Sequence, residues 1–178
     1  MTQYNFDPFP ILETERLIMR QLTDDDVDDI YYQRTDPQIN QYINRPPETL
    51  EGAASWVMRI NDSIAANESI NWGVTLKGST KIIGGFCFWN MDRENDKGEI
   101  GFSLNPPYWG MGLMQEALAA GLQYGTEVMK LQTIEAYTHP ENTRSIKLLE
   151  RNGFKRIGLP LPGGEPYAIY VLKPELPE

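Results

Sequence analysis

The chain is poor in the residues that most often build metal, disulfide and nucleophile sites. Its 178 residues contain one cysteine, Cys87, and one histidine, His139. A single cysteine cannot form an internal disulfide, and one histidine beside one cysteine argues against a zinc site or a Cys–His or Ser–His–Asp catalytic set. We therefore expect no metal ion, a buried Cys87 thiol, a loop position for His139, and a protein of the reducing cytoplasm.

Long apolar runs and positive charge are also scarce. No stretch approaches the ~20 apolar residues of a membrane span, and the first residues lack the basic and apolar parts of a signal peptide. The net charge of −9 argues against broad nucleic-acid binding, which needs a basic surface. The same charge suits a basic acceptor, or solubility alone. We expect no membrane and no nucleic-acid partner, and the choice between monomer and homodimer stays open.

The order of periodic segments predicts one domain over residues 1–178, with an irregular arm at residues 1–10. Apolar spacing, N-cap residues and Gly/Pro breaks delimit the elements. Strands are expected near 16–22, 70–77, 81–89, 98–104, 132–138, 154–158 and 167–172, and helices near 23–34, 38–43, 49–66, 113–130 and 142–152. This order is typical of a mixed α/β fold with an early, mostly antiparallel sheet and a later helical crossover.

A glycine loop before the fourth of these helices is the most informative segment. Residues 105–117 read Asn-Pro-Pro-Tyr-Trp-Gly-Met-Gly-Leu-Met-Gln-Glu-Ala. Glycines that open a helix gather backbone N–H groups at the positive end of its dipole, which suits a phosphate or pyrophosphate. An ordinary strand-to-helix turn is the alternative. The loop lacks the Lys-Ser/Thr ending of a P-loop, and Gln115 stands where a dinucleotide fingerprint needs its third glycine.

Three further segments turn this loop into a recognisable pattern. Residues 139–154 read His-Pro-Glu-Asn-Thr-Arg-Ser-Ile-Lys-Leu-Leu-Glu-Arg-Asn-Gly-Phe, residues 14–20 read Thr-Glu-Arg-Leu-Ile-Met-Arg, and residues 98–102 read Gly-Glu-Ile-Gly-Phe. Over about residues 11–173 the chain resembles the GNAT superfamily of N-acetyltransferases, in the branch that acetylates ribosomal-protein N-termini. The resemblance implies an α/β (α+β) fold: a central twisted, mostly antiparallel sheet of about six to seven strands, flanked by helices, with a splayed strand pair that holds acetyl-CoA.

The resemblance also implies which residues hold acetyl-CoA. The backbone amides of residues 109–114 would bind the pyrophosphate, and the end of the central strand together with Asn142 would bind the pantetheine arm. The cofactor-binding candidates are Phe102, Ser103, Leu104, Trp109, Gly110, Met111, Gly112, Leu113, Met114, Asn142 and Ser145. Trp109 replaces the Gln or Arg of the family pattern, and Met114 replaces a small residue. Asn142 is alternatively a helix N-cap.

A basic face of the last helix has two interpretations. Arg144, Lys147 and Arg151 either reach the 3′-phosphate of the cofactor or form an ordinary solvated face.

The catalytic candidates are Ser145 and Glu99. Many family members carry a tyrosine seven residues after the motif asparagine, but Leu149 occupies that position here. The resemblance implies that Ser145 donates a hydrogen bond to the departing thiolate, and a solvent-facing serine is the alternative. Glu99, on the central strand, is the candidate proton acceptor. Glu135 on the next strand, or solvent, is the alternative base.

The expected activity is direct transfer of an acetyl group from acetyl-CoA to a primary amine. The acceptor is a protein N-terminus or a small amine such as an amino acid, a polyamine or an antibiotic, and Tyr31, Tyr42 and Trp72 are expected to line its cleft. Because fold does not fix function, two other classes stay open. One is a non-catalytic CoA-binding sensor or regulatory module, and the other is an interaction protein that binds no cofactor.

Overall fold

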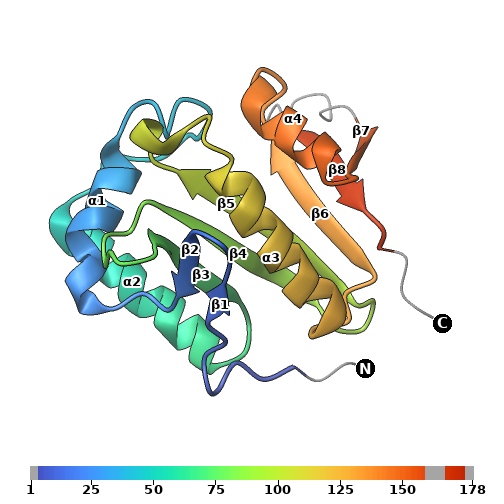
Figure 1. Ribbon diagram of the computed structural model, residues 1–178, viewed down its shortest axis with the longest axis horizontal. Helices are drawn as coiled ribbons and strands as arrows, with labels where there is room; N and C mark the ends of the chain where they lie inside the picture. Colours follow the sequence, from blue (N-terminus) through green and yellow to red (C-terminus); the bar gives the residue numbers. More distant parts are fainter. Residues whose placement is uncertain (1–3, 159–166, 175–178) are drawn as a thin grey trace.

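The computed structural model describes residues 4–158 and 167–174, which form one eight-stranded sheet with helices on both faces (Figure 1). The strands are β1 (Leu12–Glu13), β2 (Leu17–Arg20), β3 (Ile70–Leu76), β4 (Gly84–Asp92), β5 (Lys97–Leu104), β6 (Thr133–Thr138), β7 (Lys155–Gly158) and β8 (Ala168–Leu172). The helices are α1 (Val27–Thr35), α2 (Leu50–Ala65), α3 (Leu113–Glu127) and α4 (Thr143–Arg151), with 3-10 turns η1 (Asp24–Asp26) and η2 (Pro106–Tyr108). None of these described helices is long and apolar enough to cross a lipid bilayer.

The strands lie in the order β1-β2-β3-β4-β5-β6-β8-β7. Only the β5–β6 pair among these described neighbours is parallel, because α3 carries the chain back across the sheet between them. The mixed, mostly antiparallel sheet expected from the sequence is therefore confirmed, and the two-residue strand β1 is an addition to the seven strands expected.

One face of the sheet packs against α3 at very close range. Phe86 and Phe88 of β4 are buried on this face. They fit because α3 presents glycines to them: a Cβ built on Gly121 would lie 2.2 Å from the Phe86 ring, and one on Gly125 would lie 2.4 Å from the Phe88 ring. The side chains of Trp72 and Phe86 also meet here, with ring centroids 6.0 Å apart.

The opposite face packs against α1 and α2. A smaller buried cluster joins Leu22 and Ile82 to Ile30 of α1 and Val57 of α2. Gly73 of β3 faces this cluster, because successive residues of a strand face opposite sides and the neighbouring Trp72 faces α3. A Cβ built on Gly73 would lie 2.6 Å from Leu22 and 2.7 Å from Ile82. The two helix layers thus enclose the sheet from both sides.

Gly121→Ala is expected to destabilise the protein, although Gly to Ala in a helix interior ordinarily stabilises by about 1 kcal/mol. The new methyl group would collide with the Phe86 ring, and overpacking of this kind costs about 1–3 kcal/mol. Chemical denaturation measures the loss. Phe86→Leu in the same chain should restore part of the stability, and a Gly121→Ala variant as stable as the wild type would contradict the packing.

Residues 38–43 form turns and not the short helix predicted from the sequence. Side chains capture the backbone groups that a helix would use. The Asp36 carboxylate accepts hydrogen bonds from two following backbone N–H groups at 2.9 and 3.0 Å, and Asn40 donates to the carbonyls of Gln33 and Asp36. The connection between the strands expected at 81–89 and 98–104 is also shorter than expected, because β4 and β5 extend into it as a hairpin.

Strands β5 and β6 diverge partway along their length. Their parallel ladder runs from the Lys97–Thr133 pair to the Ile100–Ala136 pair. Beyond that point residues 101–104 pair with β4, and residues 137–138 pair with β8. The splayed strand pair expected from the resemblance is therefore present, and it opens a wedge between the last residues of β5 and β6.

Candidate active site

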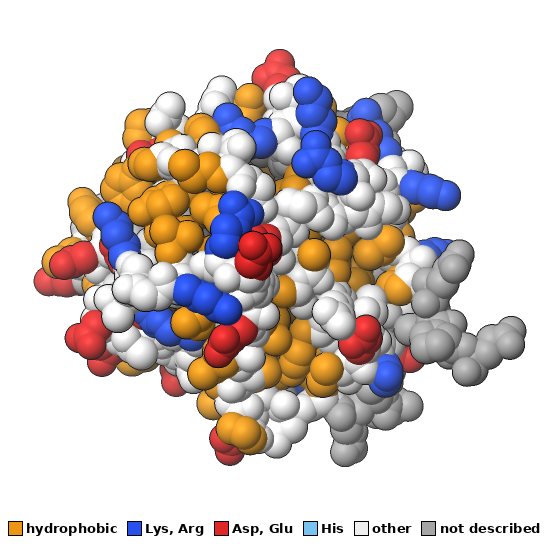
Figure 2. Space-filling model, viewed as in Figure 1, with side chains coloured by type: hydrophobic (Ala, Val, Ile, Leu, Met, Phe, Trp, Pro, Cys, Tyr) orange, Lys and Arg blue, Asp and Glu red, His pale blue; other side chains and the backbone are white. Residues whose placement is uncertain are grey.

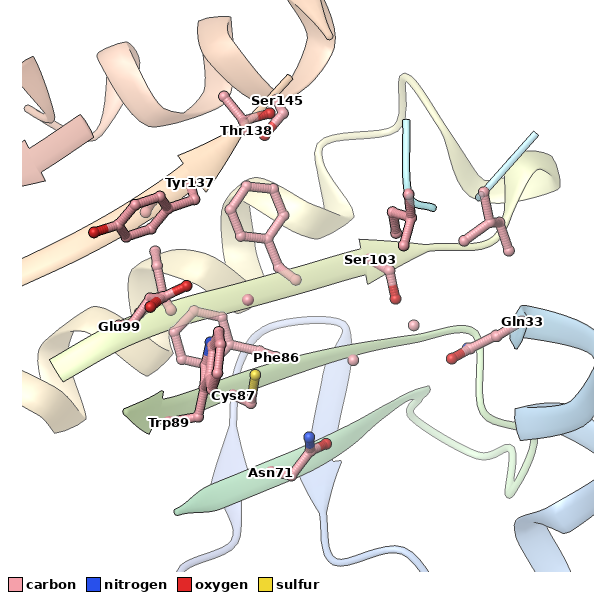
Figure 3. A pocket seen from close by; sticks show the side chains of 18 of the residues that line it. Gln33, Asn71, Phe86, Cys87, Trp89, Glu99, Ser103, Tyr137, Thr138 and Ser145 are labelled. Carbon is pink, nitrogen blue, oxygen red and sulfur yellow. The ribbon is translucent and has the colours of Figure 1, made fainter. Parts of the chain in front are cut away.

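Two cavities meet at this wedge. The first, which we call the loop cavity, has a volume of about 470 Å³ and lies between residues 38–43, the glycine loop and α4. The second, the sheet cavity, has a volume of about 430 Å³ and extends over β3, β4 and β5 toward α1 (Figure 3). Seven residues line both cavities: Ile39, Tyr42, Ile43, Phe102, Ser103, Asn142 and Ser145. The cavities therefore form one continuous space.

The glycine loop forms one wall of the loop cavity. Gly110 and Gly112 have φ angles of +77° and +76°, a left-handed conformation that side chains disfavour. Gly112 is the N-cap of α3, so the first backbone N–H groups of that helix lack helical partners. This geometry is compatible with both interpretations of the loop, as a tight turn and as a binding site for an anion.

Nearly all of the cofactor-binding candidates line this cavity. They are Phe102, Ser103, Leu104, Trp109, Gly110, Gly112, Leu113, Met114, Asn142 and Ser145. Met111 differs from them, because its side chain is 56% exposed and its carbonyl oxygen accepts a hydrogen bond from Arg16 at 2.9 Å.

Trp109 has a structural reason to replace the usual Gln or Arg. Its indole N–H donates to the carbonyl oxygen of Leu104 at 2.6 Å, which fixes the loop to the end of β5. The guanidinium of Arg144 lies 3.6 Å from the centroid of the Trp109 ring, a cation–π contact with α4. One side chain thus joins the strand, the loop and the helix that surround the cavity.

The basic residues of α4 line the same cavity. Arg144, Lys147 and Arg151 lie three and four residues apart, on one side of the helix. Figure 2 shows Lys and Arg side chains gathered over α4. In a chain of net charge −9, this local positive charge favours an anionic ligand beside the glycine loop.

A clamp from the N-terminal segment holds the glycine loop in place. The Glu116 carboxylate, in the first turn of α3, accepts hydrogen bonds from the backbone N–H of Arg16 at 2.7 Å, from its Nε at 2.8 Å, and from the Thr14 hydroxyl. Arg16 also donates to the Met111 carbonyl. Partial burial alone would raise the pKa of Glu116, but these hydrogen bonds outweigh it and lower that pKa.

Glu116→Gln is expected to weaken acetyl-CoA binding without changing the acceptor site. The substitution keeps the shape but removes a charge-assisted hydrogen bond to Arg16, worth about 1.5–3 kcal/mol, so the loop loses its fixed position. Calorimetry should find the Kd for acetyl-CoA raised about 10-fold, which corresponds to about 1.4 kcal/mol. Glu127→Gln, at the other end of α3, is the control and should leave it unchanged. Equal Kd values in both variants would contradict the clamp.

Glu99 lies in the sheet cavity, opposite Trp89 in β4 and beside Glu135 in β6. The residue is only 8% exposed. Burial raises the pKa of the Glu99 carboxyl, and the negative charge of Glu135 raises it further, while a hydrogen bond from Asn90 at 3.3 Å opposes the shift. Glu135 forms an ion pair with Lys97 at 2.9 Å, whereas Glu99 forms none with the described residues. Glu99 is therefore the one of the two candidate carboxylates that no described cation binds.

Asn142 and Ser145 stand at the junction of the cavities. The Asn142 side chain accepts a hydrogen bond from the Ser145 backbone N–H at 3.2 Å, which makes it the N-cap of α4. Ser145 is half-buried, and it lines the sheet cavity together with Thr138 at the end of β6. Leu149, in the position of the missing tyrosine, is fully buried in the wall of the sheet cavity.

The cysteine and the histidine are both placed beside the sheet cavity. Burial raises the pKa of the Cys87 thiol to about 12, so at neutral pH it stays protonated and is a poor nucleophile. The His139 ring stacks on Tyr42, with centroids 5.2 Å apart, and its Nδ1 accepts a hydrogen bond from the Glu141 backbone. Among residues 4–158 and 167–174, no group of three His, Cys, Asp or Glu residues is positioned to hold a metal ion.

The three aromatic residues expected to line the acceptor cleft lie in three different places. Tyr42 lines both cavities. Tyr31 lies on the exposed surface of α1. The Trp72 residue borders the sheet cavity, but its side chain is fully buried on the α3 face, where it packs against Tyr124 and donates to the Pro10 carbonyl.

Several residues that line the sheet cavity were not predicted from the sequence. Trp89 and Tyr137 are its exposed aromatic side chains, and Gln33, Arg45 and Asn71 are polar members of its lining. Trp89 was detectable, because residues 85, 87 and 89 of β4 share the face of Glu99 across the sheet. Gln33 and Arg45 gave no such signal, since neither belongs to the sheet.

Comparisons with known proteins identify the architecture. The sequence profile described as an acetyltransferase (GNAT) domain matches residues 16–155. An uncharacterised N-acetyltransferase p20 of Bacillus licheniformis is 35% identical over 149 residues, covering 83% of this chain and 84% of that protein. The [ribosomal protein uS5]-alanine N-acetyltransferase of Escherichia coli is 29% identical over 158 residues, covering 83% and 79%. A GNAT acetyltransferase structure from Bacillus anthracis superposes with a TM-score of 0.78 at 28% identity, covering 92% and 98%.

The domain match covers most of the chain and includes the glycine loop and the Asn142 segment. The matched proteins and the fold agree with it. This chain therefore belongs to the GNAT family of acetyl-CoA-dependent N-acetyltransferases.

Proposed function

We propose that the protein transfers an acetyl group from acetyl-CoA directly to a primary amine, with the N-terminal amine of a protein as the first acceptor to test. The single observation that carries this proposal is the junction of the two cavities at Ser103, Asn142 and Ser145, where β5 and β6 diverge. A long cofactor can enter from the loop cavity while an amine enters from the sheet cavity, so the reacting atoms meet at the junction.

The loop cavity suits the cofactor. The N–H groups at the start of α3 would bind its pyrophosphate, and Arg144, Lys147 and Arg151 add positive charge beside them. The edge of β5 that faces away from β4 pairs with no described strand over residues 101–103, which leaves backbone groups for the amides of the pantetheine arm. A Cβ on Gly110 would meet no atom of residues 4–158 or 167–174 within 4 Å, so these parts of the chain leave open space for a ligand beside the loop.

The sheet cavity supplies the proton chemistry. Amines arrive protonated at neutral pH, and a carboxylate with a raised pKa accepts such a proton more readily than an ordinary one. We assign this role to Glu99, acting directly or through a water. Acetyl-CoA supplies the activated acetyl group. The amine nitrogen bonds to its carbonyl carbon as the carbon–sulfur bond breaks, and the Ser145 hydroxyl donates a hydrogen bond to the departing sulfur.

A direct reaction is favoured over an acetylated cysteine. Cys87 is the one thiol of the chain, and it stays protonated because burial raises its pKa to about 12. The chain therefore offers no reactive thiol that could carry the acetyl group. A protein N-terminus as acceptor is supported by the uS5-alanine enzyme among the relatives. A small amine is the second acceptor class, supported by the limited volume of the sheet cavity, about 430 Å³.

A melting scan with acetyl-CoA, followed by thiol release across a panel of amines, tests this function. Ligand at 100 times its Kd should stabilise the protein by about 2.7 kcal/mol, a visible shift in Tm. The panel should include N-terminal peptides, amino acids and polyamines. No shift would contradict the cofactor site, and a shift without release from any amine would favour a CoA-binding sensor.

A further inference from the structure

The sheet cavity contains an amide group with no partner. Gln33 of α1 is only 8% exposed, and its Nε2 forms no hydrogen bond with any described residue. A buried N–H donor without an acceptor costs free energy, so nearly all such groups are satisfied in folded proteins. In Figure 3, Gln33 extends toward the cavity from the end opposite Glu99 and Trp89. Because half a turn of the amide exchanges its oxygen and its nitrogen, a ligand that fills the cavity could supply the missing acceptor.

A guanidinium that no carboxylate binds directly lines the same cavity. Arg45 follows the turn segment 38–43 and lines the sheet cavity. Burial lowers its pKa, and the nearby charge of Arg34 lowers it further. The neighbouring carboxylate, Glu48, is already bound to Arg34 at 2.5 Å, and Arg45 forms no hydrogen bond or ion pair through its side chain with the described residues. Two arginines therefore share one carboxylate, and one positive charge is left over.

We propose that Arg45 and Gln33 bind a carboxylate of the acceptor, so that the enzyme selects amines that also carry a carboxylate. The proposal rests on the function proposed above and specifies the acceptor of that site. A carboxylate is an acceptor-only group that matches an N–H fork, and it would pair the spare guanidinium and satisfy the Gln33 amide at once. The other end of the cavity holds Glu99, which suits the amine.

These two residues belong to the acceptor side. Arg45 and Gln33 line the sheet cavity and are absent from the lining of the loop cavity, where the described cations are Arg144, Lys147 and Arg151. Other residues would therefore bind the phosphates of acetyl-CoA. Both acceptor classes can carry the required group, since a free amino acid has its own carboxylate and a peptide can have an acidic side chain near its N-terminus.

Matched acceptors that differ only in charge test the proposal. One arm compares an N-terminal peptide containing Glu with the same peptide containing Gln, and the other compares a free amino acid with its carboxamide. The wild type should show kcat/KM about 10- to 100-fold higher for the carboxylate member of at least one pair, as expected for a charge-assisted hydrogen bond. The arm with the larger ratio identifies the source of the carboxylate.

Arg45→Gln should abolish this preference. It should lower kcat/KM for the carboxylate member to that of its neutral partner, while the KM for acetyl-CoA changes less than about twofold. Gln33→Leu, which removes the donor, should reduce the preference in part. Arg59→Gln removes the same charge from the exposed surface of α2 and is the control. Equal rates for both members of each pair in the wild type, or an equal loss for both in Arg45→Gln, would overturn the proposal.

Measurements of acceptor binding distinguish a failure of the carboxylate site from a failure of the proposed acetyl transfer. Calorimetry of the same pairs with the CoA-loaded protein measures the preference even where no thiol is released. Tighter binding of the carboxylate member that is lost in Arg45→Gln would support the carboxylate site while refuting catalysis. Turnover with no preference in either arm would refute the carboxylate site while leaving acetyl transfer intact.

Discussion

Glu99→Gln is expected to lower kcat/KM for the acceptor about 10²- to 10⁴-fold at neutral pH, the range typical of a lost general base. The amide keeps the volume of the side chain but cannot accept a proton. The Kd for acetyl-CoA should stay within about twofold, because Glu99 lines only the sheet cavity. Thiol release with saturating acetyl-CoA measures the effect.

The pH dependence gives a second readout of the same residue. Burial raises the pKa of Glu99, and the base acts only when it is ionised. Activity should therefore fall as the pH decreases through a value above that of an ordinary glutamate, and this limb should be missing in Glu99→Gln. Asn90→Ala removes the hydrogen bond that stabilises the carboxylate, so the limb should move to higher pH.

Glu135→Gln is the control for Glu99. It removes a carboxylate from the neighbouring strand, but that carboxylate is already paired with Lys97. We expect a much smaller loss of activity than in Glu99→Gln. The fall in activity at acidic pH should also move to lower pH, because one negative charge near Glu99 is gone. If Glu135→Gln is the more damaging variant, the base is assigned to the wrong strand. If neither variant matters, solvent accepts the proton.

Gly112→Val is expected to raise the Kd for acetyl-CoA by about 100-fold or more. Its φ of +76° is strongly disfavoured for a β-branched residue, so the loop must change conformation. A Cβ at this position would also lie 3.4 Å from the Arg16 guanidinium, which holds the loop. The N–H groups at the start of α3 then no longer converge on one anion. Calorimetry with acetyl-CoA measures the loss.

A matched glycine separates this effect from simple instability. Gly78, in the connection between β3 and β4, has a φ of +81° and open space around its Cβ position. Gly78→Val imposes the same kind of backbone strain away from both cavities. It should lower Tm while leaving the Kd for acetyl-CoA unchanged. Loss of acetyl-CoA binding in both variants, or in neither, would refute the assignment of Gly112 to the cofactor loop.

The order of the elements was predictable because it depends on local patterns. Strand alternation, the Thr49 N-cap and the glycines before α3 each act over a few residues, and the structure has strands and helices close to the expected ranges. The failure at residues 38–43 has the opposite cause. Asp36 and Asn40 compete for backbone groups there, and a helical pattern of only six residues was too weak to prevail.

The candidate site was predictable only where a motif marks it. The glycine loop was found through its glycines, and Asn142 and Ser145 through the family resemblance, and all three do come together around the loop cavity. The polar groups of the sheet cavity come from α1 and from the segment after it, which are far from β5 in sequence. No periodicity links Gln33 or Arg45 to Glu99, so their shared cavity became visible only in three dimensions.

The division of the site into two cavities has an evolutionary consequence. The residues assigned to the acceptor carboxylate lie between positions 33 and 45, whereas those assigned to acetyl-CoA lie between positions 101 and 151. Mutations at Gln33 and Arg45, which line the sheet cavity and not the loop cavity, can change which amine is accepted while the cofactor site is retained. Paralogues descended from one gene can therefore diverge in substrate through a short segment near the N-terminus, and the same segment is the natural target for redirecting the enzyme in the laboratory.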